Sequence, residues 1–315
     1  MTNYIIKRIL ALIPVLLVVS VIVFLLMFLT PGDPVSVLLG EEATEETIAQ
    51  VRHDLGYDLP IYQQFWNWFS GLFVGDLGYS IFFDQPVSTI FFDHLKPTIS
   101  LAILAQIIAI FIAITFGTIA AKKQGSVTDQ GLSTLSILGI SVPSFLLGLF
   151  LVLLFAVQLQ WLPVAGFKPL SQGLVEHLEY LLLPAIALGT MQAGLIMRMT
   201  RSSVLDVLKT PYIKTAKAKG LSSGKITYKH ALKNAFLPIL TVIGESFGTL
   251  ITGAAVVETV FNIPGLGQLI VNSISRRDFV TIQGSILMMT TMYVLLNLAV
   301  DLLYGVIDPR VRVAK

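Results

Sequence analysis

The chain of 315 residues contains no cysteine, which excludes disulfides, thiolate metal sites and cysteine nucleophiles. Charged residues are also scarce. They make up 13% of the sequence, whereas soluble domains have about 25%. Hydrophobic residues account for 55%, so the composition is that of an integral membrane protein. The net charge of +2 is too small to indicate binding of nucleic acid.

Signatures of metal binding and catalysis are missing as well. The segment G-L-S-S-G-K-I-T at 220–227 is similar to a phosphate-binding loop. However, only three residues separate its glycines, and Ile226 follows Lys225 where a Ser or Thr would bind Mg²⁺. The four histidines are too scattered to predict a metal site: His53, His94, His177 and His230. We therefore expect no catalytic residue, no metal and no cofactor, and ATP hydrolysis only on a partner subunit.

Six apolar segments are long enough to cross a bilayer, since about 20 helical residues cover about 30 Å of hydrocarbon. They are Ile9–Leu29, Thr98–Ala121, Leu132–Val157, Tyr180–Met197, Phe236–Val257 and Val280–Val306. Pro143 interrupts the third segment and predicts a kink, which either shapes a translocation pathway or serves helix packing. The predicted fold class is all-α, a polytopic membrane protein with six transmembrane helices, an outer amphipathic region and a cytoplasmic loop that contains short helices.

The basic residues indicate how these spans are oriented. With six spans, 16 of the 21 lysines and arginines fall on one side of the membrane and five on the other. Positively charged segments stay in the cytoplasm, so both termini are predicted to be cytoplasmic. The first span follows Lys7 and Arg8 and has no cleavage site, so we interpret it as an uncleaved helix.

Residues 31–96 form the longest segment between spans and carry ten acids against two bases, a composition compatible with the outside. Within this segment, Thr44–Leu55 is predicted to be a helix capped by Thr44, and the aromatic stretch Ile61–Phe73 a helix along the membrane interface. We therefore divide the chain into residues 1–30 with the first span, the extracytoplasmic region 31–96, and a five-helix core at 97–315.

Residues 198–238, here called the basic loop, hold nine of the lysines and arginines with a single acid. Thr210 is a predicted helix N-cap, Pro211 suits the first helical position, and Gly220 can end the helix in a left-handed conformation, where a side chain would crowd the turn. A second short helix is predicted to begin after Ser222.

The first of these helices has a narrow face of small and apolar residues. At helical spacing, that face collects Tyr212, Ile213, Ala216 and Gly220, with Lys217 at its margin. Such a face suits docking into a groove on another protein. A solvated basic loop, or one that contacts lipid headgroups, is the alternative on charge pattern alone.

Several segments resemble one family of membrane proteins. K-T-A-K-A-K-G at 214–220, followed by H-A-L-K-N-A-F-L-P at 230–238, resembles the cytoplasmic "EAA" loop of ABC-importer permeases, in the variant of peptide and nickel permeases. Lys214 stands where the general motif has an acid. The same permeases are resembled by P-G-D-P at 31–34, L-G-Y-D-L-P at 55–60, G-D-L-G-Y-S at 75–80, E-T-V-F at 258–261 and D-P-R-V-R at 308–312.

The resemblance implies a subunit that forms the translocation pathway of a binding-protein-dependent importer in a bacterial or archaeal cytoplasmic membrane. Its partners would be a second similar permease, two ATPase subunits and an extracytoplasmic substrate-binding protein. The short helix would be the coupling helix that contacts an ATPase. The residues expected to carry that contact are Tyr212, Ile213, Ala216, Lys217, Gly220 and Leu221.

The cargo and the class of transporter leave alternatives open. The cargo is expected to be a dipeptide or oligopeptide, with nickel or a metal chelate as the alternative. A self-sufficient secondary transporter would need polar or ionisable groups within its spans. Glu245, Gln283 and Asn297 are candidates for the translocation pathway, although Glu245 also suits an ordinary helix contact. An intramembrane hydrolase would need a recognisable catalytic motif at membrane depth, and none surrounds Glu245.

Overall fold

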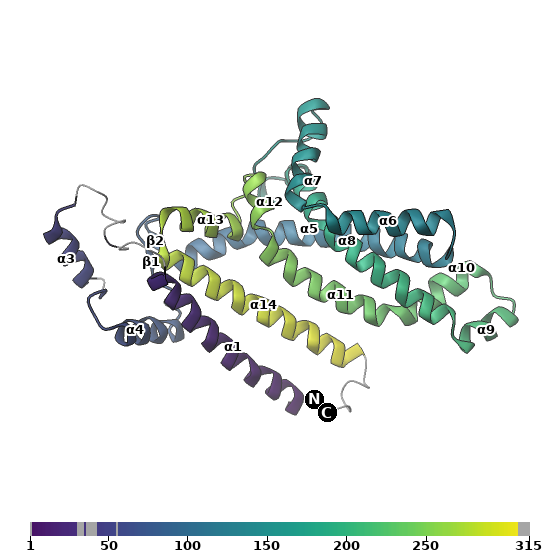
Figure 1. Cartoon of the computed structure of the whole chain (residues 1–315), viewed down its shortest axis with the longest axis horizontal. Helices are drawn as coiled ribbons and strands as arrows, with labels where there is room; N and C mark the ends of the chain where they lie inside the picture. The colour runs from purple at the N-terminus through teal and green to yellow at the C-terminus, as the bar shows by residue number, and fades with distance from the viewer. Residues whose placement is uncertain (1, 30–34, 36–42, 55, 308–315) are drawn as a thin grey trace. The chain divides into compact units, whose positions relative to one another are not determined.

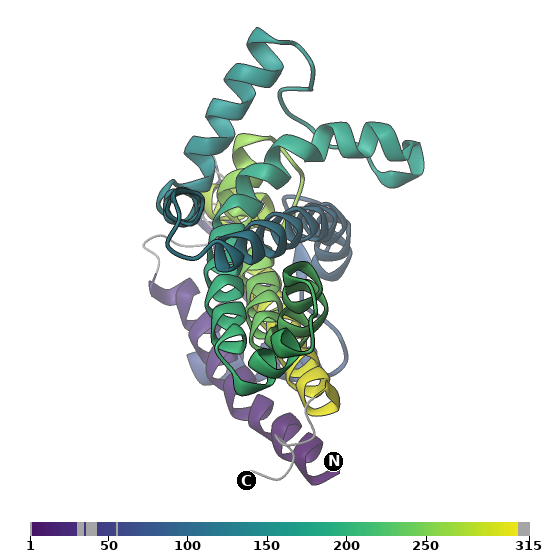
Figure 2. The same ribbon diagram turned by 90° about the vertical axis from the view of Figure 1, so that its right-hand side faces the viewer.

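The computed structural model describes residues 2–29, 35, 43–54 and 56–307, almost all of them helical (Figures 1 and 2). In chain order the elements are α1 (Thr2–Leu29), α3 (Glu45–Asp54), α4 (Ile61–Phe73), the antiparallel strands β1 (Tyr79–Ser80) and β2 (Gln85–Pro86), α5 (Val87–Lys122), α6 (Val127–Ser141), α7 (Ser144–Leu151), the π-helix η1 (Val152–Gln158), the 3₁₀-helix η2 (Leu170–Gln172), α8 (Leu174–Leu208), α9 (Pro211–Ala218), α10 (Ser223–Lys225), the π-helix η3 (Ile226–Ala231), α11 (Leu232–Gly253), α12 (Ala255–Val260), α13 (Leu266–Arg276) and α14 (Phe279–Ile307). The predicted all-α class is confirmed.

Five stretches of helix are long and apolar enough to cross a membrane. They lie in α1, α5, α8, α10 to α11, and α14. The sixth predicted span is a bent pair, in which α6 and the helix formed by α7 and η1 meet at 101°. Pro143 lies in this break. Proline has no backbone N–H with which to continue the hydrogen bonds of a helix, so α6 ends before it. The prediction of six spans therefore holds when both arms of the bent pair count as one.

Two of the spanning helices differ in length from the predicted segments. α5 begins at Val87 and runs through Pro97, although the sequence placed the start of the span at Thr98. α8 continues to Leu208, so the first part of the basic loop is still helix.

The described residues group into two compact units. Unit 1 comprises Met1–Lys96 and Gly265–Leu298, and unit 2 comprises Pro97–Pro264 and Ala299–Lys315. The three-part division made from the sequence remains a prediction. The segments at 31–34 and 308–312, and the basic residues near the C-terminus, lie outside the described residues.

In unit 2, α8 is the central helix, against which α11, α6 and α7 pack. Small residues allow this close packing. A Cβ added to Gly189 would lie 2.7 Å from the carbonyl oxygen of Ala105, and one added to Gly194 would lie 2.5 Å from that of Ser136. Membrane helices associate through such small residues because their backbones can approach closely.

In unit 1, the aromatic helix α4 packs on the C-terminal part of α1. The ring of Phe24 lies 5.2 Å from that of Phe65 and 5.8 Å from that of Trp68. α4 has the bounds predicted from the sequence. The predicted cap of α3 is also confirmed, since the Thr44 hydroxyl accepts a hydrogen bond from the Thr47 amide at 3.3 Å.

Candidate functional site

The basic loop folds after α8 into the short helix α9, whose apolar face packs on the chain itself. Ile213 and Ala216 on that face are buried against Ile226 of η3. The side chains around them are those of Val207, Leu208 and Leu221. The sequence assigned this face to another protein, but Ile213 and Ala216 are covered by the chain's own helices. The remaining surface of α9, which includes the exposed Tyr212 and Lys217 at the edges of the buried face, is open to a partner.

The turn that ends α9 is a Schellman motif at Gly220. The Gly220 N–H donates to the carbonyl of Lys217 at 2.9 Å, and the Leu221 N–H donates to that of Ala216 at 3.3 Å. Gly220 has φ +79°, so the predicted left-handed ending is confirmed. The expected crowding is wrong, because a Cβ at Gly220 would meet nothing within 4 Å. The left-handed backbone, and not a lack of space, favours glycine here.

The predicted side-chain cap of α9 is also wrong. Thr210 precedes the helix, but its hydroxyl donates to the Val207 carbonyl at 2.7 Å and makes no cap bond. A different contact fixes the start of α9, because the hydroxyl of Tyr212 and Nδ1 of His230 form a hydrogen bond of 2.5 Å. The two rings meet edge to face at 5.9 Å. His230 belongs to η3, a π-helical turn of a kind that is frequent at functional sites.

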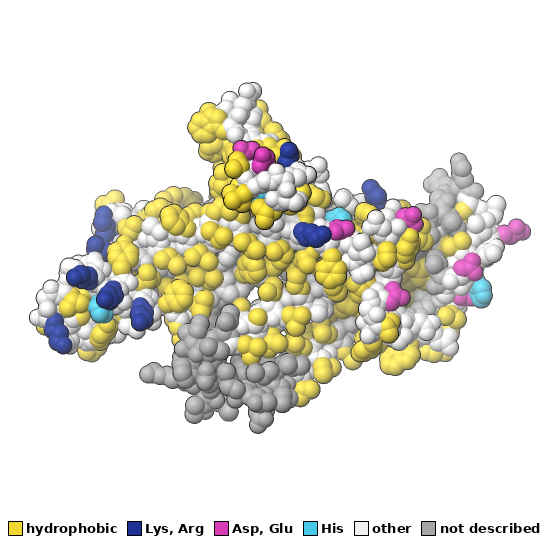
Figure 3. All heavy atoms as spheres, turned by 180° about the vertical axis from the view of Figure 1, so that it is seen from behind, with side chains coloured by type: hydrophobic (Ala, Val, Ile, Leu, Met, Phe, Trp, Pro, Cys, Tyr) yellow, Lys and Arg dark blue, Asp and Glu magenta, His cyan; other side chains and the backbone are white. Residues whose placement is uncertain are grey.

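The outer surface of the basic loop is positively charged. Its exposed lysines, here called the lysine patch, are Lys209, Lys214, Lys217, Lys219, Lys225, Lys229 and Lys233. Figure 3 shows dark blue side chains gathered over this part of the chain. None of these lysines forms an ion pair with a described residue. The patch therefore presents uncompensated positive charge to whatever lies against it.

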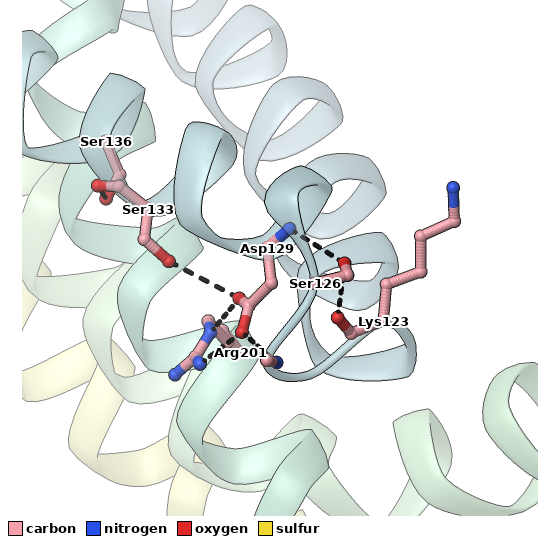
Figure 4. Close-up of polar contacts among 7 residues, drawn as sticks. Lys123, Ser126, Asp129, Ser133, Ser136 and Arg201 are labelled. Atoms are coloured by element: carbon pink, nitrogen blue, oxygen red, sulfur yellow. Dashed lines mark hydrogen bonds and ion pairs between the residues drawn. The ribbon is translucent and has the colours of Figure 1, made fainter.

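A partly buried ion pair joins α6 to the part of the basic loop that lies on α8 (Figure 4). Nε of Arg201 donates to Oδ1 of Asp129 at 2.6 Å, and Nη2 donates to Oδ2 at 2.8 Å. Asp129 also accepts a hydrogen bond from the Gly125 amide at 2.9 Å, and its side chain is only 5% exposed. Two-pronged contacts of this kind fix both distance and orientation.

Sequence reasoning missed this pair. The two residues are 72 positions apart, and Arg201 had been counted only as one charge of the basic loop. A local signal was present, because Asp129 is an acid in the first turn of α6, where the Ser126 hydroxyl accepts a hydrogen bond from its amide at 3.3 Å. That signal predicts a helix start and gives no information about the partner on α8.

The residues predicted to line a translocation pathway belong to different units. Glu245 lies on α11 in unit 2 and is exposed, whereas Gln283 and Asn297 lie on α14 in unit 1. Gln283 is buried, and its Nε2 donates to the Phe24 carbonyl at 3.4 Å, which is a packing contact. The role of all three in transport stays a prediction. In the part of the chain described, no three His, Asp or Glu side chains gather as they would to hold a metal ion.

Polar contacts hold α11 to its neighbours beside Glu245. The amide of Gln106 on α5 donates to the Ser246 hydroxyl at 3.0 Å, and that of Gln192 on α8 donates to the Thr249 hydroxyl at 2.9 Å. Buried amides of this kind bind membrane helices together. One side of α11 is thus occupied within unit 2, and Glu245 remains exposed on another.

Two family models match the chain. The model of binding-protein-dependent transport system inner membrane components matches residues 113–313, and the model of the N-terminal part of such membrane components matches residues 1–102. The chain belongs to this family. It is therefore a multi-pass permease subunit of the cytoplasmic membrane and part of a binding-protein-dependent system. This membership supports a binding-protein-dependent permease over the self-sufficient transporter considered from the sequence.

Full-length relatives agree with the family models. A probable peptide ABC transporter permease protein of Sinorhizobium fredii is 43% identical over 98% of this chain and 99% of its own length. A putative peptide transport system permease protein of Brucella abortus is 44% identical over 99% of both chains. A glutathione transport system permease protein of Shigella flexneri is 41% identical, also over 99% of both.

The fold is also that of a solved ABC transporter. A chain of the MetNI methionine ABC transporter in an inward-facing conformation matches with a TM-score of 0.57 at 15% identity. The match covers 70% of this chain and 97% of the other. The two chains therefore share a fold at low sequence identity.

Proposed function

We propose that this chain is the permease subunit of an ABC importer for peptides. It would act with a second similar permease subunit, two ATP-hydrolysing subunits in the cytoplasm and an extracytoplasmic binding protein that delivers the cargo. The relatives reported above support peptides, because their names specify peptide or glutathione over the full chain length. Those relatives give no support to the alternative of nickel or a metal chelate.

The proposed orientation places both termini and the basic loop in the cytoplasm. The lysine patch supports it, since a segment with this much uncompensated positive charge resists translocation across the membrane. The same orientation places α4 on the opposite side of the bilayer, where its aromatic residues suit the membrane interface. ATP hydrolysis is proposed for the partner subunits, because the segment at 220–227 does not have the spacing of a phosphate-binding loop.

Coupling to the ATPase is proposed for the open side of α9. One observation carries this proposal: α9 is seated on the chain by Ile213 and Ala216, while its other side carries lysines that have no ion-pair partner among the described residues. Ile213, Ala216 and Leu221 would then hold the coupling helix in place. The residues that meet the ATPase would be Tyr212, Lys217 and Gly220, which are exposed.

Glu245 is proposed to face the translocation pathway or the second permease subunit. An ionisable group within a span needs polar surroundings, because its charge is costly in hydrocarbon. Unit 2 leaves Glu245 exposed. Its polar surroundings would therefore be supplied by the assembled transporter, either by the partner subunit or by water and cargo in the pathway.

Reversing one charge of the lysine patch tests the coupling proposal. We would reconstitute the four-subunit transporter in proteoliposomes and measure both peptide uptake and the ATP hydrolysis stimulated by the loaded binding protein. Lys217→Glu is compared with Lys123→Glu, a matched reversal at an exposed lysine outside α9 whose side chain points away from the Asp129 pair (Figure 4). We expect Lys217→Glu to lower uptake per ATP hydrolysed about tenfold. Reversing a charge at an interface weakens the binding free energy of the two subunits by more than about 1 kcal/mol.

The control decides what a loss of uptake means. Lys123→Glu is expected to leave the ratio of uptake to ATP hydrolysis unchanged. If both reversals had the same effect, general electrostatics at the membrane surface would explain the result. Normal coupling in Lys217→Glu would remove α9 as the contact with the ATPase.

A further inference from the structure

A cavity of about 260 Å³ lies within unit 1, between the C-terminal part of α1, one face of α4 and the start of α14. Its lining is both aromatic and polar, with the ring of Phe24 and the indole of Trp68 beside the amide of Gln64 and the carboxylate of Asp76. The cavity is several times larger than the roughly 30 Å³ that one water occupies in the liquid. It is large enough for a small polar group of several atoms.

The sequence of α4 creates this cavity on one face of the helix. Gln64, Trp68 and Gly71 recur at helical spacing and share that face, where the missing side chain of Gly71 leaves room. Elsewhere on the helix, Trp66 is 65% exposed and Phe73 is 79% exposed. Exposed aromatic residues of this kind lie at the boundary between lipid headgroups and acyl chains. In a bilayer, the polar face of α4 would therefore lie at headgroup depth.

Two polar atoms in the cavity lining are buried and have no hydrogen-bond partner among the described residues. One is the carbonyl oxygen Oε1 of Gln64, and the other is the indole N–H of Trp68. The orientation of the Gln64 amide is fixed, because its Nε2 donates to the carbonyls of Tyr57 at 3.1 Å and Leu59 at 2.7 Å. A buried polar atom without a partner is destabilising. A ligand that satisfied both atoms would donate a hydrogen bond to Gln64 Oε1 and accept one from the Trp68 N–H.

The charges around the cavity restrict which ligand fits. Asp76 supplies a negative charge, and no lysine or arginine is among the described lining residues. An anionic headgroup would therefore meet no cation. A primary ammonium can donate to Gln64 Oε1 and approach both the Asp76 carboxylate and the face of an aromatic ring. A quaternary ammonium has no N–H and leaves Gln64 Oε1 without a donor. The Trp68 N–H requires an acceptor, such as a phosphate oxygen.

We propose that this cavity binds the phosphoethanolamine headgroup of an aminophospholipid. Its ammonium would lie between Gln64 Oε1 and Asp76, and a phosphate oxygen would accept the hydrogen bond of Trp68. The acyl chains would extend from the headgroup into the bilayer. The proposal goes beyond the transport activity, and it depends only on the chain being embedded in a membrane. A failure of the coupling test would therefore leave it unaffected.

The test is lipid binding by the purified transporter, measured by native mass spectrometry. The assembled complex, delipidated in mild detergent, is titrated with phosphatidylethanolamine, phosphatidylcholine and phosphatidylglycerol of identical acyl chains. We expect one tightly held phosphatidylethanolamine for each copy of this chain. Trp68→Phe removes only the indole N–H and is expected to weaken that binding about three- to tenfold, the usual effect of one hydrogen bond. Asp76→Asn keeps the acceptor for the Gly78 amide and removes the charge that favours an ammonium.

Trp66→Phe is the matched control, since it makes the same change on the same helix outside the cavity. It should bind phosphatidylethanolamine like the unchanged protein. Equal retention of the three lipids, or equal losses in the two tryptophan variants, would overturn the proposal. Displacement of the lipid by an excess of a dipeptide would assign the cavity to peptide amines and would also overturn it. A Trp68→Phe protein that elutes and unfolds like the parent excludes misfolding as the cause of lost binding.

Discussion

Replacing Arg201 by methionine leaves a buried carboxylate without its counter-ion and tests what the Asp129 pair contributes. Methionine keeps much of the volume and the apolar stem of arginine. In the variant, Asp129 retains the Gly125 amide as a donor but loses both guanidinium hydrogen bonds, of 2.6 and 2.8 Å. Its side chain is 5% exposed, so water does not replace the lost contacts. The unpaired negative charge of Asp129 therefore lowers the free energy of unfolding of the variant.

The expected magnitude follows from this burial. Removing one partner of a buried ion pair costs about 3–5 kcal/mol. Arg201 is 32% exposed, so the pair is partly screened, and we expect Arg201→Met to cost about 2–3 kcal/mol. Asp129→Asn keeps the acceptor oxygen and is expected to cost about 1–2 kcal/mol. The double variant should cost no more than Arg201→Met alone, because no charge is left buried. The two changes would then differ from additivity by at least about 1–2 kcal/mol.

The assay is equilibrium unfolding of the purified chain in mixed micelles, in which SDS is titrated into a mild detergent and helicity is followed by circular dichroism. The parent, the two single variants and the double variant complete a mutant cycle. Strict additivity of the two single changes would refute the reasoning, since it would mean that the guanidinium contributes nothing specific to the Asp129 site. A double variant less stable than both singles would contradict it equally.

Two further predictions concern the end of α9 and the orientation of the chain. Gly220→Ala is expected to destabilise the chain by about 1 kcal/mol in the same micelle assay, because alanine resists φ +79°. Gly220→Asn should cost less, since asparagine tolerates this conformation; a larger loss with asparagine would mean that space is limiting after all. Because the chain has no cysteine, Lys219→Cys should react with a membrane-impermeant maleimide only in inside-out vesicles, and Val74→Cys only in intact spheroplasts. The reverse labelling pattern would invert the proposed topology.

The parts of the fold that sequence predicts well are those fixed by neighbouring residues. α9 lies where Pro211 and Gly220 place it, since proline suits a helix start and glycine the left-handed turn that ends it. The helix at 61–73 has its predicted bounds because Pro60 precedes it and the turn at Gly75 follows it. These signals act within a few residues, and tertiary packing did not override them.

The direction of a helix face could not be predicted in the same way. Periodicity identified Ile213 and Ala216 as the apolar side of α9, but it carries no information about what covers that side. The 101° bend at Pro143 and the contact between Asp129 and Arg201 depend on elements that are distant in the sequence. The helical spacing of apolar residues predicts that a face is buried, and only the tertiary structure shows whether the chain or a partner buries it.

The way α9 is seated changes how it would couple to an ATPase. A coupling helix whose apolar face entered a partner's groove would be held mainly by that partner. Here the apolar face packs on the chain itself through Ile213 and Ala216. The Tyr212 hydroxyl is also hydrogen-bonded to His230, on the turn that leads into α11. A displacement of α9 by the ATPase would therefore move α8 and α11 as well, because these contacts prevent α9 from moving independently. Substitutions that weaken the packing of Ile213 and Ala216 should therefore impair coupling as much as substitutions on the surface that meets the ATPase.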